Sequence, residues 1–409
     1  MSVSQYLERY AQPEARLAVQ ARGERWQWVV VVPCCDELDG APRLLESLRR
    51  AAVAGGGRAL AVLVINSGEG AKPEVYKANQ QLLAELGGEG LQRGVAALDL
   101  WLVDRDSPGR RIPVAEGVGL ARKLGCDLAL ALIDAGAVEV PWLWTTDGDA
   151  EVPEDYFAAV LGDDESTAIT LPFAHLPTED HPRAPVAIRL YDLSLRYYVA
   201  GLRYAGSAWS YYSIGSTLVL RADAYAKVRG FPRRAAGEDF HLLAKLAKLG
   251  PVSCAAGSPI LLQGRVSHRV PFGTGAAVAK LVEEPDPELS FRLYDPRSFS
   301  ELAAWLACCA ELVQSQRAAE LLPALEGVSS IPAGLLAVLV DELGLSQSVW
   351  SACESSARLE VRQRHLHSRL DALWTLRFIH RLRDRIWPEL PWQQALQQAP
   401  FAVRAEGGG

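Results

Sequence analysis

The 409-residue sequence predicts an α/β fold: a doubly wound, mixed sheet followed by a helical C-terminal extension. Short, almost fully apolar runs alternate with amphipathic segments in the first part of the chain, which is typical of strands buried on both faces with helices between them. After Pro285 the composition shifts toward Ala, Leu and Arg, which favours helices. Because 49% of the residues are hydrophobic, the chain can bury the core of one large domain or two moderate ones.

Each expected element rests on a local pattern. The β-branched run that starts at Trp28 is stopped by Pro33, and a leucine pattern at helical spacing follows it. Residues 2–25 are predicted to form one amphipathic covering helix with a turn at Gly23. Strands are expected at 28–32, 60–65, 98–103, 140–146 and 259–263, and helices at 41–51, 72–86, 113–135, 299–319, 332–343 and 346–387. The domains are accordingly an N-terminal segment at 1–25, the sheet domain at 26–284 and a helical region at 285–409.

Composition restricts the class of function. A net charge of −7 argues against general nucleic-acid binding, which normally needs a basic surface. The seven cysteines lack CxxC spacing and include two adjacent pairs, so we interpret them as reduced packing residues of a cytoplasmic protein. The N-terminal residues do not resemble a signal peptide, and no apolar run reaches membrane-spanning length. We therefore expect a soluble protein.

The segment WLWTTDGDAEVPEDY, at 142–156, carries the strongest chemical signal. Side chains at i and i+2 of an extended segment point the same way, so Asp147 and Asp149 are predicted to present two carboxylates to one point. Ligand sites of open α/β sheets lie beyond the carboxyl ends of the strands, where this pair is expected. Mg²⁺ or Mn²⁺ suits such oxygen ligands and would neutralise a departing diphosphate. An ordinary acidic Asp-Gly turn is the alternative.

Five segments together resemble family 2 glycosyltransferases with the GT-A fold. They are VVVVPCCDELDGAPRLLESL, LVINSGEG, GVGLARKLG, WTTDGDAEVP, and IGSTLVLRADAYAKVRGF followed by AGEDFHLLAKLAKLG, in the family's order over roughly residues 26–275. The resemblance implies a nucleoside-diphosphate sugar donor, an acceptor that the sequence does not identify, and Mn²⁺ or Mg²⁺. Asn66 departs from a more usual aspartate. The QxxRW motif and membrane helices of processive synthases are absent, which implies a single transfer.

The resemblance also assigns residues to roles. It implies catalytic Asp239 as the general base beside Glu238; nucleotide-sugar contacts from Pro33, Glu37, Asn66, Arg122 and Asp147; and metal ligands Asp149, Asp147 and His268. Trp209, Tyr211 and Tyr212, in a Gly- and Ser-rich segment, are predicted to bind the acceptor. The alternatives are a helix cap for the Glu-Asp pair, a surface arginine for Arg122 and a structural role for His268.

Other functions stay open. A retaining transferase would share the fold and need no base at Asp239. A sugar-phosphate nucleotidyltransferase would begin with a glycine-rich loop that PCCDELDG lacks. A non-catalytic sugar-binding module would not need both a metal pair and a separate acid motif. The arginines of 356–387 alternate with apolar residues, which suits either a helix on anionic membrane or, as we favour, a packing helix; a homodimer contact is also open.

Overall fold

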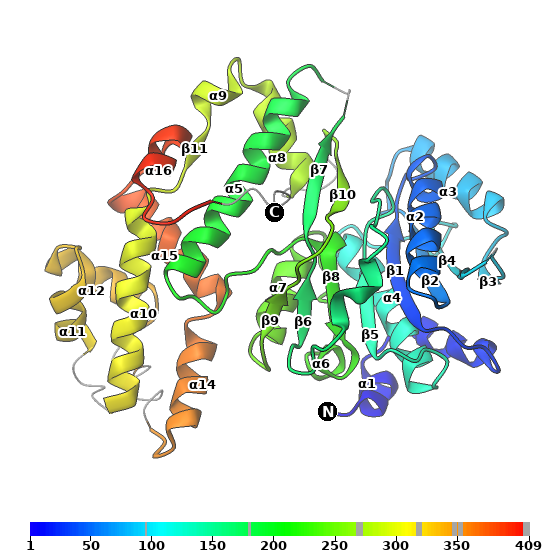
Figure 1. Cartoon of the computed structure of the whole chain (residues 1–409), viewed down its shortest axis with the longest axis horizontal. Helices are drawn as coiled ribbons and strands as arrows, with labels where there is room; N and C mark the ends of the chain where they lie inside the picture. The colour runs from blue at the N-terminus through cyan, green and yellow to red at the C-terminus, as the bar shows by residue number, and fades with distance from the viewer. Residues whose placement is uncertain are drawn as a thin grey trace. The chain divides into compact units, whose positions relative to one another are not determined.

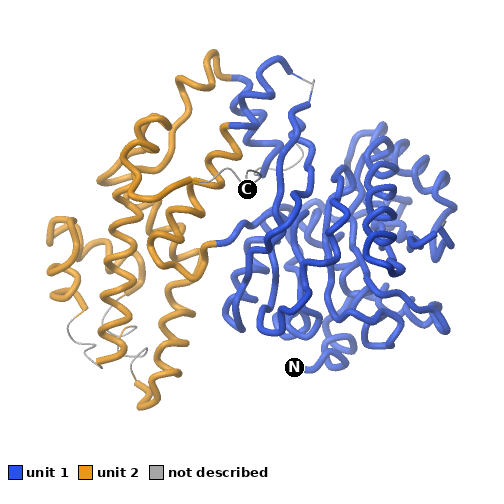
Figure 2. Tube along the Cα trace, in the orientation of Figure 1, with its two compact units in different colours: residues 1–189, 211–283, 406–409 blue, residues 190–210, 284–405 orange. Residues whose placement is uncertain are grey.

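The computed structural model describes residues 1–94, 96–178, 181–266, 273–315, 321–345, 350 and 355–403. The chain divides into two compact units, coloured separately in Figure 2. Among the described residues, the sheet unit comprises Met1–Arg189 and Tyr211–Glu283, and the helical unit comprises Leu190–Ser210 and residues 284–403. Residues 190–210 therefore join the helical unit, although the sequence pattern groups them with the sheet domain.

An eight-stranded mixed sheet is the centre of the sheet unit and confirms the predicted α/β fold class (Figure 1). The strand order is β3-β4-β2-β1-β5-β8-β6-β9. β1 (Trp28–Cys34), β2 (Ala59–Asn66), β4 (Leu98–Arg105) and β5 (Trp142–Thr145) run parallel, as predicted. The other members are β3 (Gly90–Gln92), β8 (Leu218–Arg221), β6 (Ala168–Thr170) and β9 (Val252–Cys254), of which β3 and β8 run antiparallel to their neighbours. β7 (Phe173–Pro177) and β10 (Ile260–Gly264) form a separate parallel pair.

The register brings the ends of the central strands to one edge of the sheet. Val31 of β1 lies opposite Val62 of β2 on one side and Thr145 of β5 on the other. Every residue of β1 and β2 is buried, as expected for apolar runs in a parallel sheet covered on both faces. The residues that follow β1, β2 and β5 thus emerge at the same edge, where ligand sites of such sheets lie.

Helix α4 (Gly117–Asp134) packs directly on this sheet. A Cβ on Gly125 would lie 2.4 Å from Val31 Cγ1, so only glycine allows the helix to come this close. The other elements of the unit are α1 (Val3–Arg9), η1 (Pro13–Ala21), α2 (Gly40–Ala54), α3 (Pro73–Glu85), η2 (Tyr156–Val160), η3 (Gly215–Thr217), α6 (Ala222–Lys227), α7 (Glu238–Leu246) and α8 (Thr274–Glu283).

The prediction of one helix over residues 2–25 is wrong. α1 ends at Arg9, and Pro13 opens the 3₁₀ segment η1, because proline disfavours the α conformation in the residue before it and lacks an amide donor. The segment is nevertheless a cover. The Tyr6 hydroxyl donates to Asp127 of α4 at 2.5 Å, and the Gln12 amide donates to the same carboxylate at 2.8 Å.

The helical unit confirms the predicted C-terminal helical extension. Its core includes Trp305 and Phe378, whose ring centroids lie 4.9 Å apart. Its elements are α9 (Pro287–Ser290), β11 (Arg292–Leu293), α10 (Arg297–Ser315), α11 (Leu321–Val328), α12 (Ala333–Glu342), α14 (Leu359–Arg369), α15 (Ala372–Arg385), β12 (Leu390–Pro391) and α16 (Trp392–Gln398); α5 (Ala184–Tyr204) begins in the sheet unit and continues here. The helix predicted over 346–387 is interrupted where Asp371 caps α15.

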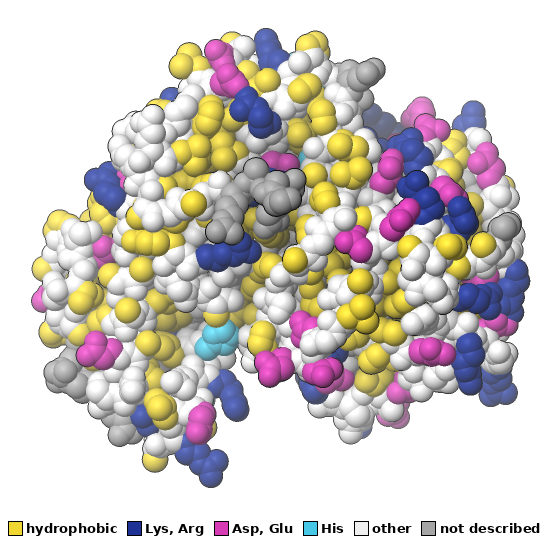
Figure 3. Space-filling model, viewed as in Figure 1, with side chains coloured by type: hydrophobic (Ala, Val, Ile, Leu, Met, Phe, Trp, Pro, Cys, Tyr) yellow, Lys and Arg dark blue, Asp and Glu magenta, His cyan; other side chains and the backbone are white. Residues whose placement is uncertain are grey.

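Several arginines of α14 and α15 have partners inside the helical unit. Arg362 is buried and donates to the Val313 carbonyl at 2.9 Å, while Arg381 and Arg385 pair with Glu342. On the face shown in Figure 3, basic and acidic side chains are intermixed. No described helix combines the length and the apolarity needed to cross a bilayer. These contacts favour the packing interpretation of the arginine-rich segment.

Candidate active site

The two aspartates after β5 take different partners. Asp147 pairs with Arg122 of α4, whereas Asp149 pairs with Arg265, which follows β10. The period-two argument does not hold here because β5 ends at Thr145 and the Ala150 amide donates to the Asp147 carbonyl at 3.2 Å, closing a turn. The pair does lie at the carboxyl edge of the sheet, as the sequence predicts.

Arg122 joins the aspartate turn to the acid pair of α7. Its guanidinium donates to Asp147 with one terminal nitrogen and to Glu238 with the other, and the residue is only 4% exposed. Burial opposes the charge, but Asp147 and Glu238 hold the pKa of Arg122 above its ordinary value. Arg122 thus forms a buried bridge between two motifs whose residues Asp147 and Glu238 lie more than 90 residues apart in the chain.

Asp239 stands at the start of α7 with a strongly altered acidity. Burial, followed by the neighbouring Glu238 carboxylate, raises the pKa of Asp239 to about 7, although Arg122 acts in the opposite direction. The N-cap position belongs to Gly237, whose φ of 70° suits glycine, and Asp239 accepts the Phe240 amide at 2.7 Å. Capping the helix therefore does not account for Asp239, and a carboxyl group with a pKa near 7 suits proton transfer.

Glu37, after β1, shares an arginine with Asp149. Arg265 Nη2 lies 2.6 and 2.7 Å from the two Glu37 carboxylate oxygens and also contacts Asp149. A Cβ on Gly148 would lie 3.0 Å from Glu37 Cγ, so the glycine between the aspartates lets the two loops meet. Arg265 was missed from the sequence; the available signal was a basic residue just beyond the expected strand at 259–263.

Asn66, at the end of β2, has a structural reason for not being an aspartate. Its side-chain amide donates to the Cys34 carbonyl at 3.1 Å and to the Val64 carbonyl at 2.9 Å, bonds that a carboxylate could not make. Asn79 donates to the Asn66 carbonyl at 2.9 Å. Pro33 lies within β1, in register with Val64 of β2. These contacts hold the carboxyl ends of β1 and β2 together.

The three aromatic residues predicted to bind the acceptor are divided between the units. Trp209 belongs to the helical unit, donates to the Leu370 carbonyl at 2.7 Å and stacks on His367 with ring centroids 4.6 Å apart. Tyr211 and Tyr212 belong to the sheet unit and are buried. Trp209 is thus held by structural contacts within the helical unit.

Among the described residues of the site, the side chains that could bind a divalent cation are carboxylates. Within the described ranges, no group of three or more His, Cys, Asp and Glu side chains is arranged to hold a metal ion. His268, the third predicted ligand, lies outside the described residues. Glu37 and Asp149 do converge on one cationic nitrogen, that of Arg265, and such carboxylate oxygens are the ligands that Mg²⁺ and Mn²⁺ prefer.

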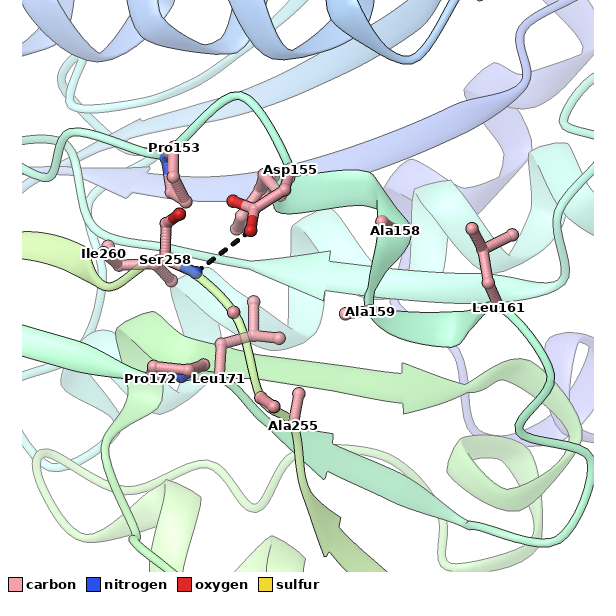
Figure 4. Close-up of a pocket in the computed structure, with 13 residues that line it drawn as sticks. Pro153, Asp155, Ala158, Ala159, Leu161, Leu171, Pro172, Ala255, Ser258 and Ile260 are labelled. Atoms are coloured by element: carbon pink, nitrogen blue, oxygen red, sulfur yellow. Dashed lines mark hydrogen bonds between the residues drawn. The ribbon is translucent and has the colours of Figure 1, made fainter. Parts of the chain in front are cut away.

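A small cavity lies apart from these charged groups. It measures about 260 Å³ and is lined by residues of 153–161, 171–172 and 255–260 (Figure 4). Asp155 points to Ser258, whose amide it accepts at 3.0 Å, and aliphatic side chains make up most of the remaining wall. The cavity contains none of the predicted site residues and is smaller than the ~300–1,000 Å³ of typical small-molecule sites.

Comparisons with known proteins give structural similarity only. No family model and no curated protein matches the chain. The chain is similar to S. aureus TarS 1-349 in complex with UDP-GlcNAc. The identity is 12%, the match covers 83% of this chain and 90% of that chain, and the TM-score is 0.40. It is also similar to glucosyl-3-phosphoglycerate synthase from Mycobacterium tuberculosis in complex with Mn²⁺, UDP and glucosyl-3-phosphoglycerate. The identity is 14%, the match covers 69% of this chain and 88% of that chain, and the TM-score is 0.34. A third similar structure is the mannosyltransferase PcManGT from Pyrobaculum calidifontis in complex with GDP-Man and Mn²⁺. The identity is 18%, the match covers 90% of this chain and 92% of that chain, and the TM-score is 0.33. At these identities and TM-scores, function is inferred from the chain's own residues.

Gly215 leaves the space that Arg122 occupies. A Cβ at this position would lie 2.5 Å from Arg122 Cζ, so Gly215→Ala is expected to displace the buried guanidinium and to destabilise the fold by about 1–3 kcal/mol. Urea unfolding measures the change. Gly327→Ala is the matched control, because that exposed helical glycine has no heavy atom within 4 Å of the added carbon; equal effects in the two variants would contradict the packing account.

Proposed function

We propose that the chain is an inverting glycosyltransferase that moves a sugar from a nucleoside-diphosphate sugar to an acceptor hydroxyl in a single transfer. The observation that carries the proposal is the Arg122 bridge, which joins Asp147 of the donor-side turn to Glu238, the neighbour of Asp239. Both motifs therefore belong to one site at the carboxyl edge of the sheet, where ligands of open α/β folds bind.

The residues of this site have distinct tasks in the proposed reaction. Asp239 takes the proton from the acceptor hydroxyl while the hydroxyl oxygen attacks the anomeric carbon from the face opposite the departing diphosphate. Glu238 is a positioning residue, because Arg122 holds it and its charge raises the pKa of Asp239. The nucleotide is assigned to the edge formed by Glu37 and Asn66. When bound at Asp149, Mn²⁺ or Mg²⁺ supplies positive charge that neutralises the diphosphate.

Donor binding is expected to require a divalent cation through Asp149. Titration calorimetry with UDP- and GDP-sugars should show binding in Mn²⁺ that weakens at least about tenfold in chelator and in Asp149→Ala, because the diphosphate and the carboxylates otherwise repel each other. Asp155→Ala, which alters an acidic residue of the separate cavity, is the control. Equal affinity in Mn²⁺ and chelator would remove the metal from the proposal.

The pH dependence of kcat/KM should report Asp239. The ionised carboxylate is the active form, and its pKa of about 7 predicts that kcat/KM falls about tenfold per pH unit below pH 7 and levels off above it. Because the Glu238 charge contributes to raising that pKa, Glu238→Gln should move the acid limb to lower pH. An acid limb at the same pH in both proteins would contradict the assignment.

A further inference from the structure

The Arg122 guanidinium is held on one flat face as well as at its edges. Its two terminal nitrogens donate to Asp147 and to Glu238, which fixes the edges. A Cβ on Gly215 would lie 2.5 Å from Arg122 Cζ and 2.7 Å from each terminal nitrogen. Because the central carbon is nearer than either nitrogen, Gly215 lies over the face of the guanidinium rather than beside its edge. The backbone at Gly215 therefore blocks the guanidinium from tilting toward that side.

A threonine ties this glycine to the central sheet. Thr145, the last residue of β5, is buried and donates its hydroxyl to the Gly215 carbonyl at 2.6 Å. In an apolar strand, a valine of nearly the same shape would bury no polar group, so the hydroxyl at this position is explained by the bond that it makes. Thr145 thus connects the strand that leads to Asp147 with the backbone over Arg122.

The turn that contains Gly215 does not need this bond for its own shape. Thr217 donates to the Ile214 carbonyl with both its amide and its hydroxyl, each at 3.0 Å. Loss of the Thr145 hydroxyl should therefore leave the turn closed but no longer tied to the side chain at the end of β5. A substitution at Thr145 can thus change the position of the turn without unfolding it.

We propose that Thr145 is a positioning residue: by holding Gly215, its hydroxyl keeps the Arg122 guanidinium between its two carboxylate partners. The inference rests on the proposed function for its effect on sugar transfer. The contacts themselves belong to the free protein, because they all lie within the sheet unit and need no ligand. Release of the guanidinium would leave Glu238, the neighbour of Asp239, without a fixed orientation, and misplaced catalytic groups lower turnover.

Hydrogen exchange at Arg122 tests the contact without sugar transfer. Its Nε–H group is buried and has no hydrogen-bond partner among the described residues, so exchange with water reports release of the side chain. In the full-length protein with ¹⁵N-labelled arginine, the NMR signal is assigned by its absence from Arg122→Met. Loss of one hydrogen bond should make this exchange about two- to tenfold faster in Thr145→Val.

Two variants separate this effect from a general loss of stability. Thr145→Ser keeps the hydroxyl and should exchange at the parental rate. Thr167→Val is the matched control, because it removes another buried hydroxyl that donates to a backbone carbonyl, that of Pro251 at 3.0 Å. The Thr167 carbonyl accepts the amide of Arg221, which lies opposite the first residue of β5, so this threonine is at the other end of that strand. The control should leave the exchange at Arg122 unchanged.

Steady-state kinetics connect the contact to the reaction. Thr145→Val should lower kcat about ten- to hundredfold, as a small misplacement in a site does, with little change in the donor KM, because the nucleotide is assigned to Glu37 and Asn66. Thr145→Ser should recover kcat. Parental exchange or parental kcat in Thr145→Val, no recovery in Thr145→Ser, or equal changes in Thr167→Val would overturn the inference. Failure of the proposed function would appear separately, as a parent protein that transfers no sugar while the exchange rates at Arg122 follow the expected order.

Discussion

Replacement of Asp239 by asparagine is expected to lower kcat by about a hundredfold to ten-thousandfold and to leave donor affinity nearly unchanged. Asparagine is close in shape but cannot accept the acceptor's proton, and the donor is assigned to the other end of the site. Steady-state kinetics with a saturating nucleotide sugar measure the turnover, and titration calorimetry measures the affinity.

Asp223→Asn is the matched control for this variant. Asp223 also lies in the first turn of a short helix, α6, but it pairs with Arg221 and Lys227. Its replacement should change turnover little. Near-parental turnover in Asp239→Asn, or equal losses in the two variants, would mean that Asp239 is not the base, and a retaining mechanism would then become the better account.

The second large effect concerns stability. Arg122→Met is expected to lower the free energy of unfolding by about 3–5 kcal/mol, because it leaves the buried Glu238 carboxylate without its counter-charge. Urea unfolding at neutral pH measures the loss. The substitution also removes the influence that lowers the pKa of Asp239, so the acid limb of any residual activity should move to higher pH.

Arg49→Met provides the comparison for Arg122→Met. Arg49 pairs with Glu46, and the two side chains are 35% and 54% exposed, so solvent screens the pair and its loss should change the free energy of unfolding little. If Arg122→Met proved no more destabilising than Arg49→Met, the bridge between the two motifs would be a weak contact and would not hold Glu238 in place.

The sequence predicts the central strands because a strand that is buried on both faces needs apolar residues at nearly every position. The run that begins at Trp28 and the one that ends at Ile65 are almost entirely apolar, and both form strands that are buried throughout. β3, β6 and β9 span only three residues each, too few for a period to show. The apolar spacing of residues 2–25 predicts one helix, but Pro13 opens a separate 3₁₀ segment after α1 has ended at Arg9.

The site was predictable in its place but not in its contacts. The end of β5 marks the edge that carries Asp147 and Asp149, since a strand pattern and the ligand rule for α/β sheets suffice for that. Arg265 lies 228 residues from Glu37, and no local pattern reports such a pair. The acidity of Asp239 likewise depends on burial and on Glu238, which only the folded chain determines.

The most direct test of the central claim is the anomeric configuration of the sugar first released from the donor. Proton NMR of the protein with an α-linked nucleoside-diphosphate sugar and Mn²⁺ should show slow cleavage by water in place of the acceptor. The account predicts that the nascent sugar appears as the β anomer before mutarotation and that Asp239→Asn abolishes its appearance. Release of the α anomer, or no cleavage of any nucleotide sugar, would contradict it.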